Sequence, residues 1–143
     1  MKSIATKFLI LFVFSASFLS CAQNTKQDNE NEPMEAIQKR VVSLISPKDL
    51  NGLNDIQLID VRTPEEYAEG HLEKAMNINY YDDAFMSDMI SKLDKSKPIY
   101  IYCKSGGRSG KASKKLKAEG FTKVYDLEGG IINWNKNNMK VIK

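Results

Sequence analysis

Short apolar runs alternate with helix-forming segments along most of this chain, and this alternation constrains the fold more than any other feature. The runs are at residues 41–45, 56–61, 76–79, 99–102 and 124–127. Strands that alternate with helices favour a parallel sheet that is covered by helices on both faces. Ligand sites of such sheets lie beyond the carboxyl ends of the strands. We therefore expect an α/β fold of three layers, with a central, mainly parallel sheet flanked by helices.

The segments after the first two runs carry helix start and stop signals. Ser46 suits an N-cap, Pro47 follows it, and Gly52 suits the end of that helix. Residues 63–66 form a capping box, and the helix that it opens is expected to end near Gly70. These signals predict two short helices, one after each run.

Three later segments have apolar residues at helical spacing, which predicts a core-facing stripe on each helix. The segments are residues 83–93, residues 110–119 and the turn of helix after residue 130. Their predicted inward residues are Phe85, Met86, Met89, Ile90, Leu93, Ala112, Leu116, Ile131, Ile132 and Trp134. We interpret the methionines and the tryptophan as packing residues rather than as parts of a metal or cofactor site.

The most reactive side chain lies where the fourth run ends, in the segment Cys103-Lys104-Ser105-Gly106-Gly107-Arg108-Ser109. A Gly-rich turn before a helix directs backbone N–H groups and the positive helix end inward, so it attracts anions. The same field stabilises a thiolate and lowers the pKa of a cysteine below its usual value of roughly 8.5. Lys104 and Arg108 add positive charge, and Gly106 and Gly107 allow the backbone to turn tightly. The loop is predicted to hold Cys103 as a nucleophilic thiolate in an anion-binding site.

The first residues have the pattern of an export signal. Residues 1–7 contain two lysines, residues 8–19 are apolar apart from two serines, and the small Ser20 precedes Cys21. The ending Phe18-Leu19-Ser20-Cys21 resembles a bacterial lipobox, although leucine usually stands where Phe18 does. We expect residues 1–20 to be a lipoprotein signal peptide that is removed before Cys21. A lipid on Cys21 would anchor the chain in the bacterial cell envelope, on the periplasmic side or at the outer membrane. The alternative is an ordinary signal peptide with a chance cysteine.

The segment after the signal is expected to be a flexible tether. Residues 21–36 have no apolar period and are rich in Asn, Gln and acidic residues. Residues 37–143 are then the single folded domain. With Cys21 used as a lipid site, Cys103 is the only free thiol of the mature chain, and an unpaired thiol in an oxidising compartment favours a functional role.

The charge of the chain gives no reason to expect a nucleic-acid partner. The sequence has 21 basic and 18 acidic side chains, and removal of residues 1–20 takes away Lys2 and Lys7 and leaves 19 and 18. Proteins that bind nucleic acid show a basic face together with a recognition motif. We expect a domain without a nucleic-acid partner.

From residue 41 to about residue 137 the chain resembles a single-domain rhodanese. Three segments, in order and at normal spacing, carry the resemblance. They are residues 59–78, which contain Asp60-Val61-Arg62 and Gly70-His71-Leu72; the loop Tyr102–Ser109; and residues 124–130 followed by Trp134. One departure is Lys74, where the family usually has Gly.

The resemblance implies a sulfurtransferase that acts as a monomer without a cofactor. Cys103 would attack the outer sulfur of a small anionic donor such as thiosulfate and hold it as a persulfide. The acceptor would be cyanide or a thiol, including a thiol of a partner protein. The donor would be bound by residues of the loop, namely Lys104, Ser105, Gly106, Gly107, Arg108 and Ser109. A zinc site would need about four ligands, which this chain lacks, so no metal is expected.

The resemblance gives different weights to three further residues of the first segment. Asp60 is expected to be a structural hydrogen-bonding residue. Arg62 is expected either at the rim of the substrate pocket or in a structural position, and the sequence leaves both open. His71 is the only histidine, and its place in the family pattern indicates a structural role rather than a catalytic Cys–His pair.

Two other functions are weighed against sulfur transfer. Dual-specificity phosphatases of related fold have five residues between their cysteine and arginine, whereas four separate Cys103 from Arg108. The shorter loop leaves less room for a phosphate group. The other alternative is a non-catalytic rhodanese-like binding module or a persulfide carrier, although the retained Cys103 favours catalysis.

Overall fold

The computed structural model describes residues 42–143. The predicted signal peptide, Cys21, the tether and residues 37–41 lie outside the described residues. The elements in chain order are β1 (Ser43–Ile45), α2 (Pro47–Asn51), β2 (Gln57–Asp60), α3 (Pro64–Glu69), β3 (Met76–Asn77), α4 (Phe85–Lys92), β4 (Ile99–Tyr102), α5 (Gly107–Ala118), β5 (Val124–Leu127) and α6 (Gly130–Lys136).

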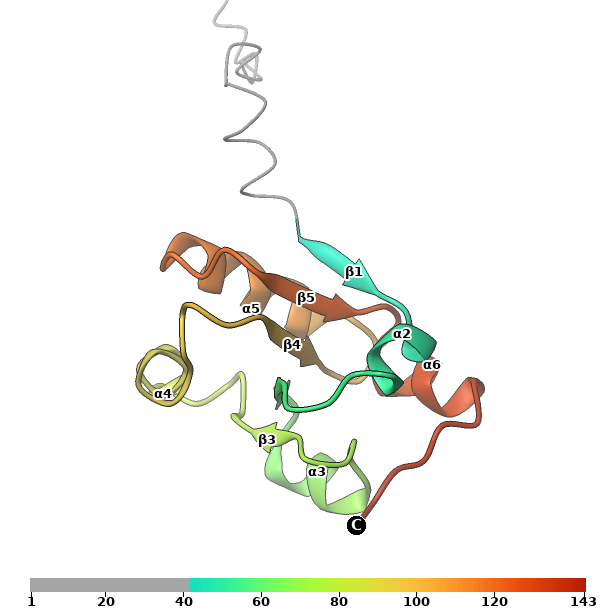
Figure 1. Cartoon of the computed structure of the whole chain (residues 1–143). Helices are drawn as coiled ribbons and strands as arrows, with labels where there is room; N and C mark the ends of the chain where they lie inside the picture. Colours follow the sequence, from blue (N-terminus) through green and yellow to red (C-terminus); the bar gives the residue numbers. More distant parts are fainter. Residues whose placement is uncertain (1–41) are drawn as a thin grey trace, which may run out of the picture. The chain divides into compact units, whose positions relative to one another are not determined.

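The five strands form one sheet in the order β1-β5-β4-β2-β3, and each pair of neighbouring strands is parallel (Figure 1). The strand β4 is therefore central, with β5 on one side and β2 on the other. Parallel neighbours need crossover connections, which the intervening helices provide. The prediction of an α/β fold with a mainly parallel sheet is confirmed.

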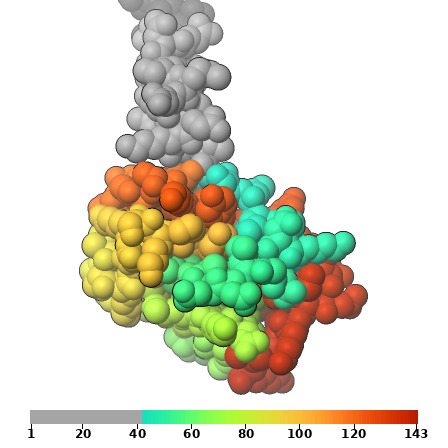
Figure 2. Space-filling view, in the orientation of Figure 1, coloured from blue at the N-terminus to red at the C-terminus, as the bar shows by residue number. Residues whose placement is uncertain are grey.

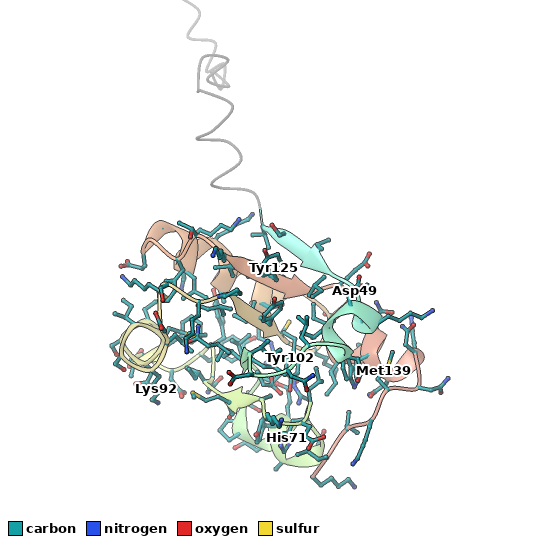
Figure 3. All side chains as sticks on the ribbon, in the orientation of Figure 1. Asp49, His71, Lys92, Tyr102, Tyr125 and Met139 are labelled. Carbon is teal, nitrogen blue, oxygen red and sulfur yellow. The ribbon has the colours of Figure 1, made fainter. Side chains whose placement is uncertain are left out.

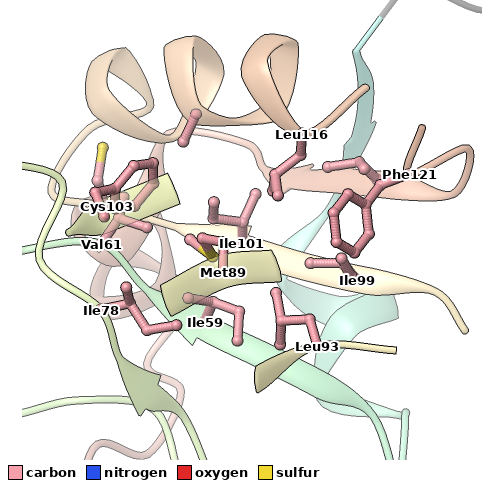
Figure 4. Close-up of a cluster of buried hydrophobic side chains, with 13 residues drawn as sticks. Ile59, Val61, Ile78, Met89, Leu93, Ile99, Ile101, Cys103, Leu116 and Phe121 are labelled. Atoms are coloured by element: carbon pink, nitrogen blue, oxygen red, sulfur yellow. The ribbon is translucent and has the colours of Figure 1, made fainter. Parts of the chain in front are cut away.

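Helices cover both faces of the sheet, and each face has its own buried cluster. One cluster joins Ile59, Ile101 and Val124 of the sheet to residues of α4 and α5 (Figure 4). The other joins Leu58, Tyr102 and Leu127 to residues of α2 and α6. Successive residues of a strand point to opposite faces, so each buried strand supplies both layers.

The predicted helix signals are present. The Ser46 hydroxyl accepts a hydrogen bond from the Asp49 N–H, and Gly52 is the C-cap of α2. At α3 both hydrogen bonds of the capping box form, and the helix ends at Gly70. The two N-caps were predicted from residue type alone, because capping depends on a local hydrogen bond.

Two predictions about the later helices were wrong in detail. The helix α5 begins at Gly107, three residues before the predicted start at residue 110, so the last three of the seven loop residues are helical. The exposed fractions of Ile90 and Ile132 are both 40%, although both were predicted to face the core. Each stands at the edge of its apolar stripe, where helical spacing does not decide burial. Met86 is partly buried, and the other predicted core residues are buried, with Trp134 only 5% exposed.

The last residues run back across the domain and lie against the segment after α3 (Figure 2). His71 and Ile142 exchange two backbone hydrogen bonds of 2.9 Å in an isolated antiparallel bridge. The Trp134 indole N–H donates to the Lys140 carbonyl oxygen at 3.0 Å. This segment therefore covers the second buried cluster near α6. Within residues 42–143, no helix has the length and apolar character needed to cross a bilayer.

Candidate active site

Cys103 lies directly after β4, at the carboxyl edge of the sheet where parallel sheets bind their ligands. Its sulfur points toward α5, and the residue is only 1% exposed (Figure 4). The thiol is not part of a disulfide. The predicted nucleophile is therefore at the expected edge of the sheet, at the floor of its loop.

The Cys103 sulfur accepts hydrogen bonds from two donors of the loop. The Gly106 N–H lies 3.2 Å from the sulfur, and the Ser109 hydroxyl lies 3.4 Å from it. Burial raises the pKa of the Cys103 thiol, but hydrogen bonds from the Ser109 side chain and from the backbone of Ser109, Ser105 and Gly106 outweigh it. The pKa of Cys103 is lowered overall, as expected for a thiol used as a thiolate.

Gly106 gives the loop its shape. Its φ of 99° lies in the left-handed region that favours glycine, and it is the N-cap residue of α5. The Gly110 N–H then donates to the Gly106 carbonyl oxygen at 2.9 Å and closes the first turn. The helix α5 therefore begins four residues after Cys103, which explains how so short a loop brings the positive helix end to the thiol.

The helix α6 holds the backbone of the loop from the other side. The N–H of Ile131 donates to the Cys103 carbonyl oxygen at 3.0 Å, and that of Ile132 donates to the Lys104 carbonyl oxygen at 3.2 Å. At Gly130, φ is 58°, and an added Cβ would lie 2.7 Å from the Lys104 oxygen and clash with that of Cys103. The sequence predicted only a turn at this position. The Gly129-Gly130 pair was the signal that two backbone segments come close together here.

Arg108 forms an ion pair that the sequence did not predict. Its two terminal nitrogens donate to the two carboxylate oxygens of Glu66 at 2.6 and 2.9 Å, and its guanidinium lies 5.6 Å from the centroid of the Tyr81 ring. The hydrogen bond from Arg108 lowers the pKa of Glu66 to about 2. Glu66 therefore offsets the charge of Arg108, and attraction of a donor by Arg108 stays a prediction.

Asp60 and Arg62 form a buried pair beside the central strand. Asp60 is fully buried and Arg62 is 5% exposed. The Arg62 guanidinium donates to both carboxylate oxygens and also to the Gly70 carbonyl oxygen at 2.8 Å, and its backbone N–H donates to Asp60. These contacts tie β2 to the end of α3 and support the predicted structural role of Asp60.

The comparisons with known proteins agree with this geometry. A model of the rhodanese-like domain matches residues 46–137. The chain belongs to the rhodanese-like domain family. Thiosulfate sulfurtransferase GlpE of Coxiella burnetii (strain RSA 331 / Henzerling II) is 30% identical over 113 residues, which are 79% of this chain and 90% of that protein.

Two further comparisons define how far the similarity reaches. The tRNA uridine(34) hydroxylase of Pelagibacter ubique (strain HTCC1062) is 31% identical over 156 residues, which cover 98% of this chain. The chain spans about half of that protein, because the match covers 52% of it. The crystal structure of a rhodanese-related protein from Thermoplasma volcanium has a TM-score of 0.60 and 27% identity, and the match covers 70% of this chain and 97% of that one. Family membership therefore rests on the domain alone.

A pocket adjoins the loop of this rhodanese-like domain. Its volume is about 280 Å³, and its walls include Arg62, Lys104 and Ile131. Arg62 thus lines a pocket beside the loop even though its guanidinium is held by Asp60. Lys104 is exposed and lines the same pocket. Arg62 and Lys104, which lie 42 positions apart in the sequence, therefore line one opening.

His71 has a structural environment. Its ring stacks on Tyr67 with the centroids 3.6 Å apart, and its Nδ1 lies 3.1 Å from the Tyr67 carbonyl oxygen (Figure 3). Its backbone bridges to Ile142. No interaction of its ring with Cys103 is present among residues 42–143, which supports the structural role. The described residues also contain no group of three His, Cys, Asp or Glu side chains that could hold a metal.

Lys74 and Asp126 are two positions whose significance the sequence did not reveal. Lys74 stands where the rhodanese family usually has Gly, and its φ of 64° explains that preference. Asp126 is a carboxyl of β5 that is only 3% exposed, and the sequence predicted no role of its own for this residue. Burial raises the pKa of Asp126 to about 6.

Proposed function

We propose that this rhodanese-like domain is a sulfurtransferase that moves sulfane sulfur from a thiosulfate-like donor to a thiophilic acceptor through a persulfide on Cys103. The observation that carries the proposal is the pair of donors on the Cys103 sulfur, the Gly106 N–H at 3.2 Å and the Ser109 hydroxyl at 3.4 Å. Donors fixed in this way favour the thiolate, which is the nucleophilic form of cysteine.

The first half of the reaction forms the persulfide. The Cys103 thiolate attacks the outer sulfur of thiosulfate, and a bond forms between the two sulfur atoms. The bond from the outer sulfur to the sulfonate sulfur breaks, and sulfite leaves with the electron pair. The negative charge now lies on the terminal sulfur of the persulfide, within the same positive helix end and loop N–H groups.

The second half returns the enzyme to its thiolate. An acceptor such as cyanide attacks the terminal sulfur, the sulfur–sulfur bond breaks, and thiocyanate leaves while Cys103 keeps the electron pair. A thiol acceptor takes the sulfur in the same way. Lys104 is exposed beside the loop and supplies positive charge that attracts an anionic donor, whereas Glu66 offsets the charge of Arg108.

A phosphatase reaction fits this loop less well. Only four residues separate Cys103 from Arg108, and Glu66 holds the Arg108 guanidinium by two hydrogen bonds. A phosphate group needs both a wider loop and a free bidentate arginine. We expect no turnover of an aryl phosphate by this domain.

The test compares the wild type with Cys103→Ser. We expect the wild type to produce thiocyanate from thiosulfate and cyanide and to gain one sulfur atom on the peptide that contains Cys103, as seen by mass spectrometry. The serine variant should do neither. If both proteins are inactive and the Cys103 peptide gains no sulfur, the domain is a binding module; if it gains sulfur without turnover, it is a persulfide carrier.

A second proposal concerns location. We propose that the chain is anchored to the cell envelope by a lipid on Cys21, because residues 1–21 combine an export signal with a lipobox-like ending. In cells, the Cys21→Ala variant should leave the membrane fraction for the soluble fraction, while Cys103→Ser should stay with the membrane. Equal partitioning of the two variants would contradict the lipid anchor.

A further inference from the structure

A buried carboxyl group lies close to the active loop and is not used by the proposed reaction. Asp126 is only 3% exposed, and its Oδ1 atom has no hydrogen-bond partner in the described part of the chain. The hydroxyl of the fully buried Ser113 also lacks a partner there. Buried polar atoms without partners are costly and point to a role beyond packing.

The sheet register places Asp126 and Cys103 under the same helix. Asp126 pairs with Ile101 of β4, and Cys103 follows two residues after Ile101, so all three side chains point to the same face. The helix α5 covers this face, and a Cβ added to Gly110 would lie 3.5 Å from the Asp126 Oδ2. The first turn of α5 therefore packs directly on the carboxyl group.

Ser109 connects the two groups. Its hydroxyl lies 3.4 Å from the Cys103 sulfur, and hydrogen bonding by the same side chain acts to lower the pKa of Asp126. A serine hydroxyl has one proton to donate. When Asp126 is ionised, it accepts the hydrogen bond from Ser109. When Asp126 is protonated, it donates to Ser109 instead, and the Ser109 hydroxyl is then free to donate to the sulfur.

The surroundings of Asp126 contain few other charges. The paired strands β1 and β4 carry no charged side chain, and the tyrosines of β4 and β5 point to the opposite face. The cations of the covering helix α5 are Arg108, Lys111, Lys114, Lys115 and Lys117. Burial is the main cause of the raised pKa of Asp126, the Ser109 hydrogen bond opposes it, and no charged side chain contributes.

We propose that Asp126 is a positioning residue for Cys103 that acts through Ser109 and takes up the proton that the thiol loses. The Cys103 S–H bond breaks as the thiol proton passes to the Ser109 oxygen, and the original Ser109 O–H bond breaks as the hydroxyl proton passes to the Asp126 carboxylate. The result is a thiolate and a neutral carboxylic acid, with Ser109 unchanged in composition. Ser109 then donates to the sulfur and accepts from Asp126.

This inference deepens the proposed function, on which it rests for the use of the thiolate. Its measurable consequence is that Asp126 and Cys103 titrate as a pair, since ionisation of one disfavours ionisation of the other. The thiolate of the wild type should therefore form in two steps of pH. With asparagine in place of Asp126, the amide donates to Ser109 at every pH, and the thiolate should form in a single step.

The experiment measures the rate at which iodoacetamide alkylates Cys103 as a function of pH, in the full chain, from the mass of the Cys103 peptide. Asp126→Asn should change the two-step profile to one step and raise the rate near pH 7 by about three- to tenfold, which corresponds to about half to one pKa unit. In the Ser109→Ala background the same substitution should leave the profile unchanged. Superimposable wild-type and Asp126→Asn profiles overturn the proposal, and so does an equal effect in both backgrounds.

A second measurement covers the case in which Asp126→Asn does not fold. The carboxyl carbon of Asp126 is followed by NMR through a pH titration of the wild type and of Cys103→Ser. We expect two steps in the wild type and one step in the serine variant, and identical curves overturn the coupling. Neither measurement requires sulfur transfer, so the inference can stand if the proposed function fails, and the reverse also holds.

Discussion

Glu66 and Arg108 make the one ion pair that joins α3 to the active loop among the described residues, and its strength depends on pH. The pKa of Glu66 is lowered from 4.5 to about 2 in the folded chain. A lowered pKa stabilises the fold above the unfolded value, and this stability is lost as the pH falls from about 4.5 toward about 2. At neutral pH it amounts to at most about 3 kcal/mol, and solvent screening reduces it because the pair is partly exposed.

The prediction concerns Glu66→Gln. At neutral pH its free energy of unfolding in urea should be lower than that of the wild type, and the difference should largely disappear near pH 2, where about half of the wild-type Glu66 is protonated. Glu73→Gln changes an exposed glutamate in the same way and is the matched control. If the stability difference between the wild type and Glu66→Gln persisted unchanged at pH 2, the destabilisation would come from altered packing rather than from the lost charge.

Lys74 offers a stabilising substitution. Its φ of 64° is costly for a residue with a Cβ, by roughly 1 kcal/mol, whereas glycine adopts this conformation freely. We expect Lys74→Gly to raise the free energy of unfolding by up to about 1 kcal/mol, without effect on Cys103. Lys48→Gly, in the helix α2, should instead destabilise the domain. A loss of stability in both variants would contradict the argument from backbone strain.

At the level of elements, the helix α6 shapes the loop that precedes α5. Its first N–H groups bind the carbonyl oxygens of Cys103 and Lys104, which requires backbone contact at Gly130. Gly130→Ala should therefore move the loop as well as strain the residue. We expect a loss of about 2 kcal/mol or more in stability together with slower alkylation of Cys103, since positive φ and overpacking both contribute.

Gly120→Ala is the control for that prediction. Gly120 has a φ of 92°, but nothing lies within 4 Å of an added Cβ. The control should lose stability through backbone strain alone and keep the alkylation rate of Cys103. Equal alkylation rates in Gly130→Ala and the wild type would mean that α6 does not set the geometry of the loop.

The sequence predicts the bounds of the helices and strands better than it predicts the side-chain contacts between them. The strands β4 and β5 were predicted with the observed bounds because short apolar runs between turn residues are a local signal. The start of α5 was misplaced because glycines usually end helices, whereas Gly107 lies inside one. Glu66 and Arg108 are 42 residues apart, and Ser109 and Asp126 belong to different elements, α5 and β5, so neither interaction has a local pattern. Cys103 was found because its chemistry is carried by neighbours in sequence.

For the molecule as a whole, the three layers meet around a thiol that solvent hardly reaches. Cys103 is 1% exposed at the end of the central strand, with α5 over its side chain and α6 against its carbonyl group (Figure 4). We expect a small anion such as thiosulfate to enter the loop from the side of the pocket that Lys104 lines. A bulky reagent reaches the sulfur only when the loop opens locally. We therefore expect the fold to select reagents for Cys103 by size.

We expect this selection in alkylation rates measured on the full chain. Relative to the chain unfolded in urea, the native state should slow a pyrene maleimide at Cys103 by at least about tenfold more than it slows iodoacetamide. A cysteine introduced by Lys111→Cys, at an exposed position of α5, should show no such difference between the two reagents. Equal slowing of both reagents at Cys103 would mean that the loop opens as a unit, and a protein-bound persulfide would then reach the thiol as readily as thiosulfate does.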